Sequence, residues 1–417
     1  MEARSGRIFQ HPLLAVMYFV MLMLAAKLWF PLDDKLGIVL FFILLLPFFF
    51  VLLRWPNTPG ALFGGLCVMF AGKLVYALTT SPASGPDEIH YYEQVSAFQH
   101  LSEFMSYAVD HFFTQWGNIS AYPMFGMLYM PLFKWLSLED PLAIIMLNSL
   151  LLMLVVNQTY RISAQYFRYE MPALAEREAE ERQGSSFHAI IIFGLLASPS
   201  FMLLSSVFAK DVACALLGLY GAGLLLRRKY IWFIIIAAYA TGLRDYSIIY
   251  TLGIYFLYAR KVKTATLFML IAAGVLVTQI GPLGVSNAVL LMLFLFISPN
   301  PIQPGNWDSQ VIMRTLEALW MSAVLIVSII NFMKFRAVRS FYIIALLILF
   351  TYACALVLVG YVTVTGRDLE YGLGTVGDNM VRKKLPVLPI LYVISAYTLV
   401  WGRKWLLPRK MKGEGHG

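Results

Sequence analysis

Long apolar runs recur along almost the whole chain, and each is close in length to a membrane-spanning helix. Of the 417 residues, 60% are hydrophobic and only 13% are charged. A helix of about 20 apolar residues crosses the roughly 30 Å of hydrocarbon in a bilayer. Helices are favoured there because they satisfy every backbone hydrogen bond internally. The pattern predicts an all-α polytopic membrane protein without a sizeable soluble domain.

The placement of lysine and arginine predicts how the chain crosses the bilayer. Basic residues gather in short clusters beside the apolar runs, as expected for cytoplasmic loops. We therefore interpret the net charge of +9 as a topology signal and expect no nucleic-acid partner. With a cytoplasmic N-terminus, about twelve transmembrane helices are expected. They lie near residues 12–31, 36–53, 60–79, 141–161, 187–210, 211–227, 230–244, 246–259, 264–280, 312–333, 341–363 and 386–402.

Three segments are expected at the outer face without crossing the bilayer. Residues 88–115 should form an outer helix, and residues 122–136 an interfacial or re-entrant helix. If residues 122–136 crossed, the basic clusters at 227–229 and 260–263 would face outward, against the positive-inside rule. Residues 281–311, which are rich in proline near their end, are expected to form a re-entrant or surface segment.

The loop from residue 80 to residue 135 interrupts the apolar runs and carries candidate catalytic acids. It contains no lysine or arginine before Lys134, which favours export to the outer face. A Gly-Pro turn at residues 85–86 precedes Asp87 and Glu88. These two acids would occupy the first turn of a helix, where the helix dipole favours carboxylates.

The predicted topology gathers acids and bases on one face of the membrane. Such a set suits sugar transfer from a lipid phosphate donor, in which a carboxylate takes a proton from a hydroxyl while cations hold the phosphate leaving group. The candidate catalytic residues are Asp87, Glu88 and Asp211, and the candidate phosphate-binding or substrate-binding residues are His90, Lys210, Arg244, Arg367 and Arg382. Lys383 and Lys384 are expected to be an interfacial pair whose ammonium groups reach the membrane surface.

These features resemble the GT-C superfamily of membrane glycosyltransferases. The shared pattern is an acidic outer loop, a non-spanning helix that opens with proline, an inward span, a charged cytoplasmic turn, and an outward span that is followed by an acid. It is carried here by Asp87, Glu88, Pro123, Ser198, Pro199 and Asp211. The stretch from Ser198 to Asp211, followed by Arg244, is also similar to multi-spanning proteins of bacterial exopolysaccharide and O-antigen assembly. The resemblance covers residues 60–245.

The resemblance implies a division of the chain and a cellular setting. Residues 1–59 would form N-terminal spans, residues 60–280 a GT-C-like catalytic module with its outer loop at 80–135, and residues 281–417 a C-terminal module with an outer loop at 366–384. The enzyme would lie in the bacterial inner membrane with a periplasmic active face. Its partners would be a polyprenyl-linked sugar donor, a glycan or lipid-linked acceptor, and other polysaccharide-assembly proteins.

Metal use is left open by the sequence. In the superfamily the first outer loop carries the catalytic acid, which resembles Asp87, and a second acid of the donor or metal site resembles Asp211. These two could ligate one Mg or Mn ion, but two oxygen ligands make a weak site for a hard cation. The histidines do not have zinc-ligand spacing, and the three cysteines lie in apolar runs. No other cofactor is expected.

Other functions remain open. The chain could be a polymerase of lipid-linked oligosaccharide units, a flippase or transporter for a lipid-linked sugar, or a non-catalytic subunit of an export complex. A transporter would be expected to show paired repeats with broken helices, and a subunit would not need acids and arginines on one face. In the plainest interpretation, Asp87 and Glu88 begin a solvated helix and Lys210 with Asp211 marks a helix break.

Overall fold

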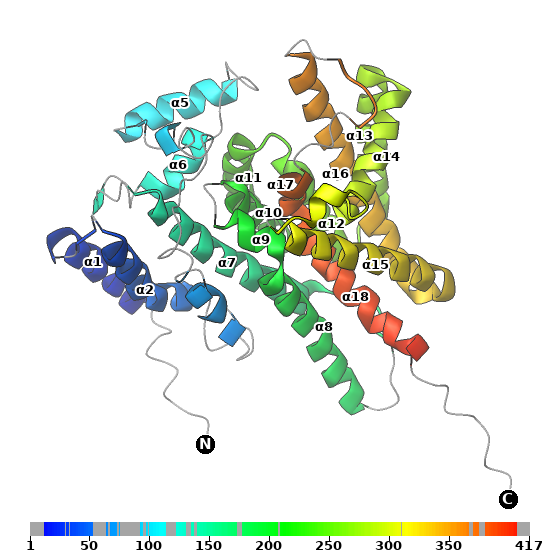
Figure 1. The fold of residues 1–417 in the computed structure, drawn as a ribbon, viewed down its shortest axis with the longest axis horizontal. Coiled ribbons are helices and arrows are strands. Elements are labelled where there is room, and N and C mark those ends of the chain that lie inside the picture. The colour runs from blue at the N-terminus through cyan, green and yellow to red at the C-terminus, as the bar shows by residue number, and fades with distance from the viewer. Residues whose placement is uncertain are drawn as a thin grey trace, which may run out of the picture. The chain divides into compact units, whose positions relative to one another are not determined.

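The computed structural model is predominantly helical in the part of the chain that it describes (Figure 1). The described residues are 12–29, 31–32, 34–52, 64–65, 67–72, 75, 92–94, 97–98, 100–113, 122–130, 135–136, 140–172, 177–206, 209–309, 311–366, 370–374 and 380–406. No strand occurs among them. The expected all-α class is therefore confirmed for these residues.

The helices form two compact units, which are described separately. The first unit comprises residues 1–161, 195–255 and 385–387. Its helices, with the described bounds of each, are α1 (Pro12–Trp29), α2 (Lys35–Leu52), α5 (Leu101–Phe113), α6 (Tyr122–Met130), α7 (Leu142–Tyr166), α9 (Pro199–Leu204), α10 (Asp211–Leu226), α11 (Tyr230–Leu243) and α12 (Ser247–Ala259). The last turns of α7 and α12 extend beyond the boundary of this unit. Within it α1 packs on α2 and α10 packs on α11, while α5 and α6 both contact α11.

The second unit comprises residues 162–194, 256–384 and 388–417. Its elements are most of α8 (Arg177–Ala197), α13 (Val262–Ile280), α14 (Pro282–Ile297), η4 (Pro304–Trp307), α15 (Ile312–Lys334), η5 (Arg336–Val338), α16 (Arg339–Thr365), α17 (Met380–Lys384) and α18 (Leu388–Leu406). The hairpin of α13 and α14 packs against α16, and α15 packs against α18. The short 3-10 turn η7 (Leu385–Val387) lies between α17 and α18 in the chain but belongs to the first unit, where it packs on α10.

Five described helices are long and apolar enough to cross a membrane, so the expectation of about twelve spans is wrong. They are Leu142–Tyr166, Val262–Ile280, Ile312–Lys334, Arg336–Thr365 and Met380–Arg403. Each corresponds to one of the expected spans. Other apolar helices are shorter: α11 has 14 residues and α10 has 16. At about 1.5 Å per residue these reach roughly 21 to 24 Å, less than the hydrocarbon thickness. The expected span at 60–79 lies largely outside the described residues.

The expected non-spanning segments have different outcomes. The described part of the expected segment at 122–136 forms α6, which has nine residues, about 14 Å at 1.5 Å per residue; its non-spanning placement stays a prediction. Residues 282–297, expected as part of a re-entrant or surface segment, form the apolar helix α14 of 16 residues, which pairs with α13. Only 11% of the apolar window of α13 is buried within the protein. The outer face of this helix is therefore suited to a hydrocarbon environment.

Two helix-helix turns place an arginine in the left-handed region of backbone space. Arg228 has φ 60° between α10 and α11, and Arg260 has φ 55° between α12 and α13. In both turns the next residue closes the helix with a backbone bond, from Lys229 N–H to Leu224 O at 2.9 Å and from Lys261 N–H to Phe256 O at 3.1 Å. Glycine is the usual residue at this position because it has no Cβ to clash.

Candidate functional site

The hairpin of α10 and α11 brings Asp211 and Arg244 together. Asp211 is the first residue of α10, and Arg244 is the C-cap residue that follows Leu243 at the end of α11. The two helices are joined by the short turn at residues 227–229 and pack on each other, so the start of one lies beside the end of the other. Two residues separated by 33 positions in the sequence therefore become neighbours.

Asp211 and Arg244 form a buried ion pair. Nη2 of Arg244 contacts Oδ1 of Asp211; the Asp211 side chain is 0% exposed and that of Arg244 is 13% exposed. The carboxylate also lies in the first turn of α10, where the helix dipole favours negative charge. Nη1 of Arg244 donates a hydrogen bond to the Tyr246 hydroxyl, and the guanidinium carbon lies 5.4 Å from the centroid of the Tyr246 ring. The arginine is thus oriented by an acid and by a phenol.

The backbone around this pair is fixed by buried hydrogen bonds. Asn148 of α7 donates to the carbonyl of Ala209, just before α10, at 2.9 Å. The Ser247 N–H donates to the carbonyl of Arg244 at 2.8 Å. Tyr250 of α12 donates to the carbonyl of Cys214 at 3.0 Å and is fully buried. A rigid scaffold of this kind is what a binding site needs to hold a charged side chain in one geometry.

Close packing of α12 on α10 requires a glycine. A Cβ at Gly218 would overlap the ring of Tyr250. The Tyr250 ring in turn packs edge-on against Tyr246, with ring centroids 6.5 Å apart. The glycine therefore contributes to the position of the phenol that contacts Arg244.

The described part of the predicted outer loop lies beside the same hairpin. The Tyr239 hydroxyl of α11 donates to the carbonyl of Met124 in α6 at 2.6 Å. Phe125 and Tyr129 of α6 are fully buried, and Phe104 of α5 is 1% exposed. Helices α5 and α6 thus pack against the helix that ends at Arg244. Asp87, Glu88 and His90, which precede these helices in the chain, lie outside the described residues.

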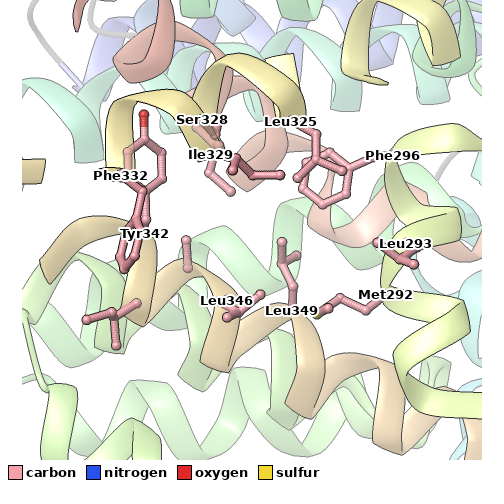
Figure 2. Close-up of a pocket in the computed structure, with 13 residues that line it drawn as sticks. Met292, Leu293, Phe296, Leu325, Ser328, Ile329, Phe332, Tyr342, Leu346 and Leu349 are labelled. Atoms are coloured by element: carbon pink, nitrogen blue, oxygen red, sulfur yellow. The ribbon is translucent and has the colours of Figure 1, made fainter. Parts of the chain in front are cut away.

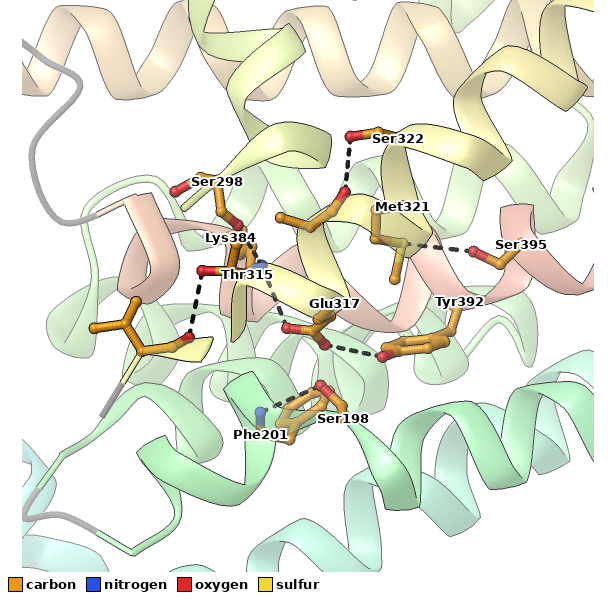
Figure 3. A network of polar contacts seen from close by, with 12 residues as sticks. Ser198, Phe201, Ser298, Thr315, Glu317, Met321, Ser322, Lys384, Tyr392 and Ser395 are labelled. Atoms are coloured by element: carbon orange, nitrogen blue, oxygen red, sulfur yellow. Dashed lines mark hydrogen bonds and ion pairs between the residues drawn. The ribbon is translucent and has the colours of Figure 1, made fainter. Parts of the chain in front are cut away.

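A second polar cluster lies in the second unit (Figure 3). Lys384, at the end of α17, donates to the carbonyl of Ser298 at 2.9 Å and pairs with Glu317 of α15 at 3.4 Å. The other carboxylate oxygen of Glu317 accepts a hydrogen bond from the Tyr392 hydroxyl at 2.9 Å. The side chains of Lys384 and Glu317 are 0% and 2% exposed. The Tyr392 ring packs on Gly194 so closely that a Cβ there would overlap it.

The expectation for Lys384 was therefore wrong. Its ammonium group is buried against Glu317, because a lysine inside an apolar bundle is stabilised by a carboxylate and a carbonyl that lie within reach. Glu317 was missed by sequence reasoning. The signal was present, since an acidic residue within a predicted membrane span is costly and needs a partner.

The remaining predicted residues are only partly placed. Lys210 is a half-buried residue at the N-cap of α10, and Arg382 is a half-buried residue of α17 in the second unit. Arg367 lies outside the described residues. No group of three potential metal ligands comes together in the described part of the chain. The suggested Mg or Mn site at Asp87 and Asp211 stays a prediction because the structure describes only Asp211, whose carboxylate is paired with Arg244.

An apolar cavity of about 340 Å³ lies in the second unit between α14, α15, α16 and α18. Figure 2 shows the ring of apolar side chains that lines it, with Ser328 and Tyr342 as the hydroxyl-bearing members. Both hydroxyls lie within hydrogen-bond distance of the Thr398 hydroxyl, at 2.8 and 3.0 Å. Its lining is thus suited to hydrocarbon, and it includes none of the predicted site residues.

The chain matches no protein-family model, no curated protein and no solved structure.

Proposed function

We propose that the protein is a membrane glycosyltransferase that transfers a sugar from a polyprenyl-phosphate donor to a glycan or lipid-linked acceptor. The observation that carries the proposal is the buried Asp211–Arg244 pair at the end of the α10–α11 hairpin. An arginine that is oriented by an acid and a phenol, and that retains partial exposure, is suited to bind a phosphate group. The five long apolar helices support a membrane setting for such a donor.

In the proposed reaction the oxygen of the acceptor hydroxyl attacks the anomeric carbon of the donor sugar. The bond from that carbon to the phosphate oxygen breaks, and the phosphate leaves with the electron pair. Arg244 binds the phosphate and stabilises the charge that develops on it. Asp87 takes the proton from the attacking hydroxyl, and Glu88 orients Asp87. Lys210, His90, Arg367 and Arg382 are further candidates for donor binding.

The ion pair favours a positioning role for Asp211. A carboxylate that is fully buried against a guanidinium is poorly available as a base or as a metal ligand. Its main effect would be to hold Arg244 in a single orientation, so that little ordering is needed when the phosphate binds. We therefore assign proton removal to Asp87 and phosphate binding to Arg244.

The proposal includes a GT-C-like arrangement with its active face on the periplasmic side of a bacterial inner membrane. It is supported by the packing of α5 and α6 against α11, because these helices belong to the loop that carries Asp87. It is also supported by the absence of basic residues from most of that loop.

The test is sugar transfer from a polyprenyl-linked donor by the purified protein in detergent. Asp87→Asn should lower turnover by about two to four orders of magnitude while folding is retained. Asp110→Asn, the same substitution in α5 of the same loop, is the matched control and should have little effect. Arg244→Lys should recover only part of the donor use that Arg244→Ala loses, because lysine offers one point charge in place of a bidentate fork.

Near-normal turnover of Asp87→Asn would remove the catalytic assignment. Movement of a lipid-linked sugar across vesicles would then be the measurement to make, since it detects the flippase alternative directly.

A further inference from the structure

The second polar cluster attaches the short helix α17 to three other helices. α17 is a helix of only five residues, of which Met380 and Lys384 are buried. Its polar attachments come from three other helices. Tyr352 of α16 donates to the carbonyl of Lys383 at 2.6 Å, and Lys384 donates to the carbonyl of Ser298 after α14 and pairs with Glu317 of α15.

The ion pair is an inefficient way to gain stability. Removing two ions from water costs several kcal/mol each, and a buried pair can often be replaced by apolar side chains of similar volume without loss of stability. What the pair adds is selectivity. The ammonium of Lys384 must meet the carbonyl of Ser298 and the carboxylate of Glu317 together, and a shift of α17 by one residue would leave both charges buried without each other.

The carboxylate is itself held in place from a further helix. The Tyr392 hydroxyl of α18 donates to the second oxygen of Glu317 at 2.9 Å. Gly194 of α8 allows the Tyr392 ring to approach closely. Glu317 is therefore oriented by one helix and in turn fixes the end of another.

We propose that Glu317 is a positioning residue that acts through Lys384 on α17 and thereby fixes Arg382, two residues earlier in the same helix. This inference rests on the proposed function, in which Arg382 is a candidate for binding the donor phosphate. Residues Arg382 and Lys384 belong to one short helix, so a helix end that is fixed at Lys384 fixes the backbone that carries Arg382.

The first arm of the test does not depend on activity. Val381→Cys is introduced into a protein whose three native cysteines are replaced by alanine, and the rate of labelling by a charged thiol reagent is measured. Glu317→Gln should speed labelling by about tenfold or more, since a lost charge-assisted hydrogen bond shifts a local opening equilibrium by that amount. Asn331→Ala is the matched control. Asn331 is also buried in α15, but its hydrogen bonds go to Tyr342 and Thr398.

A stability-matched variant separates positioning from packing. Glu317→Leu combined with Lys384→Met should fold and melt close to the parent, yet should label at position 381 as fast as Glu317→Gln. Slow labelling of this double variant would mean that apolar packing alone holds α17, and it would overturn the proposal.

The second arm is a double-mutant cycle on the Michaelis constant for the donor. Glu317→Gln should raise this constant about tenfold in the parent and should add nothing in the Arg382→Ala background. The free-energy effects of two substitutions are not additive when one residue acts through the other. Multiplicative effects, or an unchanged constant for Arg382→Ala alone, would overturn the link between Glu317 and donor binding. A parent protein without sugar transfer would instead refute the proposed function, and the labelling arm would still decide whether Glu317 fixes α17.

Discussion

The Asp211–Arg244 pair gives the sharpest prediction for stability. Arg244→Ala leaves a carboxylate that is 0% exposed without its guanidinium partner. Breaking a buried pair in this way costs about 3 to 5 kcal/mol, because the remaining charge is neither solvated nor paired. For a unit of about 150 to 250 residues, each kcal/mol lowers the melting temperature by about 2 to 4 °C. The expected loss is therefore about 6 to 20 °C.

Two further variants test the physical reason. Tyr246→Phe keeps the ring beneath the guanidinium but removes the hydroxyl, so it should cost less, about 1.5 to 3 kcal/mol for a hydrogen bond to a charged group. Asp211→Leu combined with Arg244→Met removes both charges and should restore the melting temperature to near that of the parent. The same double variant should nevertheless lose sugar transfer, because the phosphate ligand is gone.

The measurement is thermal unfolding of the purified protein in one detergent, followed by tryptophan fluorescence, with expression and monodispersity checked for each variant. The reasoning would be refuted if Arg244→Ala melted within about 1 °C of the parent, since a buried carboxylate cannot lose its partner so cheaply. It would also be refuted if the apolar double variant melted as low as Arg244→Ala.

Three other outcomes follow from local contacts. Gly218→Ala should destabilise the protein by about 1 to 3 kcal/mol, because the added Cβ overlaps the Tyr250 ring. Gly274→Ala is the control: its Cβ would meet no described atom within 4 Å, so in the same melting assay it should be neutral or stabilising by up to about 1 kcal/mol. Asn287→Leu should speed thiol labelling at Leu373→Cys, because Asn287 holds the 371–374 turn through bonds to Tyr371, Gly372 and Gly374. Burial raises the pKa of the Tyr107 hydroxyl to about 12, so the unfolded chain, in which this pKa is about 10, loses the proton first as pH rises. The contribution of Tyr107 to stability should therefore fall between pH of about 10 and about 12. Comparing the melting temperatures of Tyr107→Phe and the parent across this pH range measures the fall.

The helical class and the five long helices could be predicted because their apolar runs exceed the length needed to cross a bilayer. One expected span ends at residue 280, where α13 ends, and another begins at residue 312, where α15 begins. The count failed where short apolar runs were taken for full spans. The expected spans at 211–227 and 230–244 agree with α10 and α11 to within one residue, but helices of 16 and 14 residues are shorter than the hydrocarbon thickness.

The site was predictable only in part, for a related reason. Asp211 and Arg244 were each singled out because a charge beside an apolar run is costly, but their pairing was not predicted and follows from the packing of the α10–α11 hairpin. The partner of Lys384 could not be found in the same way, because Glu317 lies 67 positions away and the contact depends on the packing of α15 against α17 and not on a repeat in the sequence. Local patterns report helix faces, whereas contacts between distant helices depend on tertiary packing.

The arginines in the two left-handed turns favour correct membrane insertion but lower the stability of the folded protein. Replacing Arg228 or Arg260 by glycine would relieve a conformation that costs a residue with a Cβ roughly 1 kcal/mol. The same change would remove one positive charge from a basic cluster, and basic clusters beside apolar helices favour retention on the cytoplasmic side during insertion. Insertion is decided once, during synthesis, whereas the backbone strain persists for the lifetime of the molecule. A directed-evolution experiment selecting only for heat resistance should therefore drift toward glycine at these turns and accumulate misoriented chains.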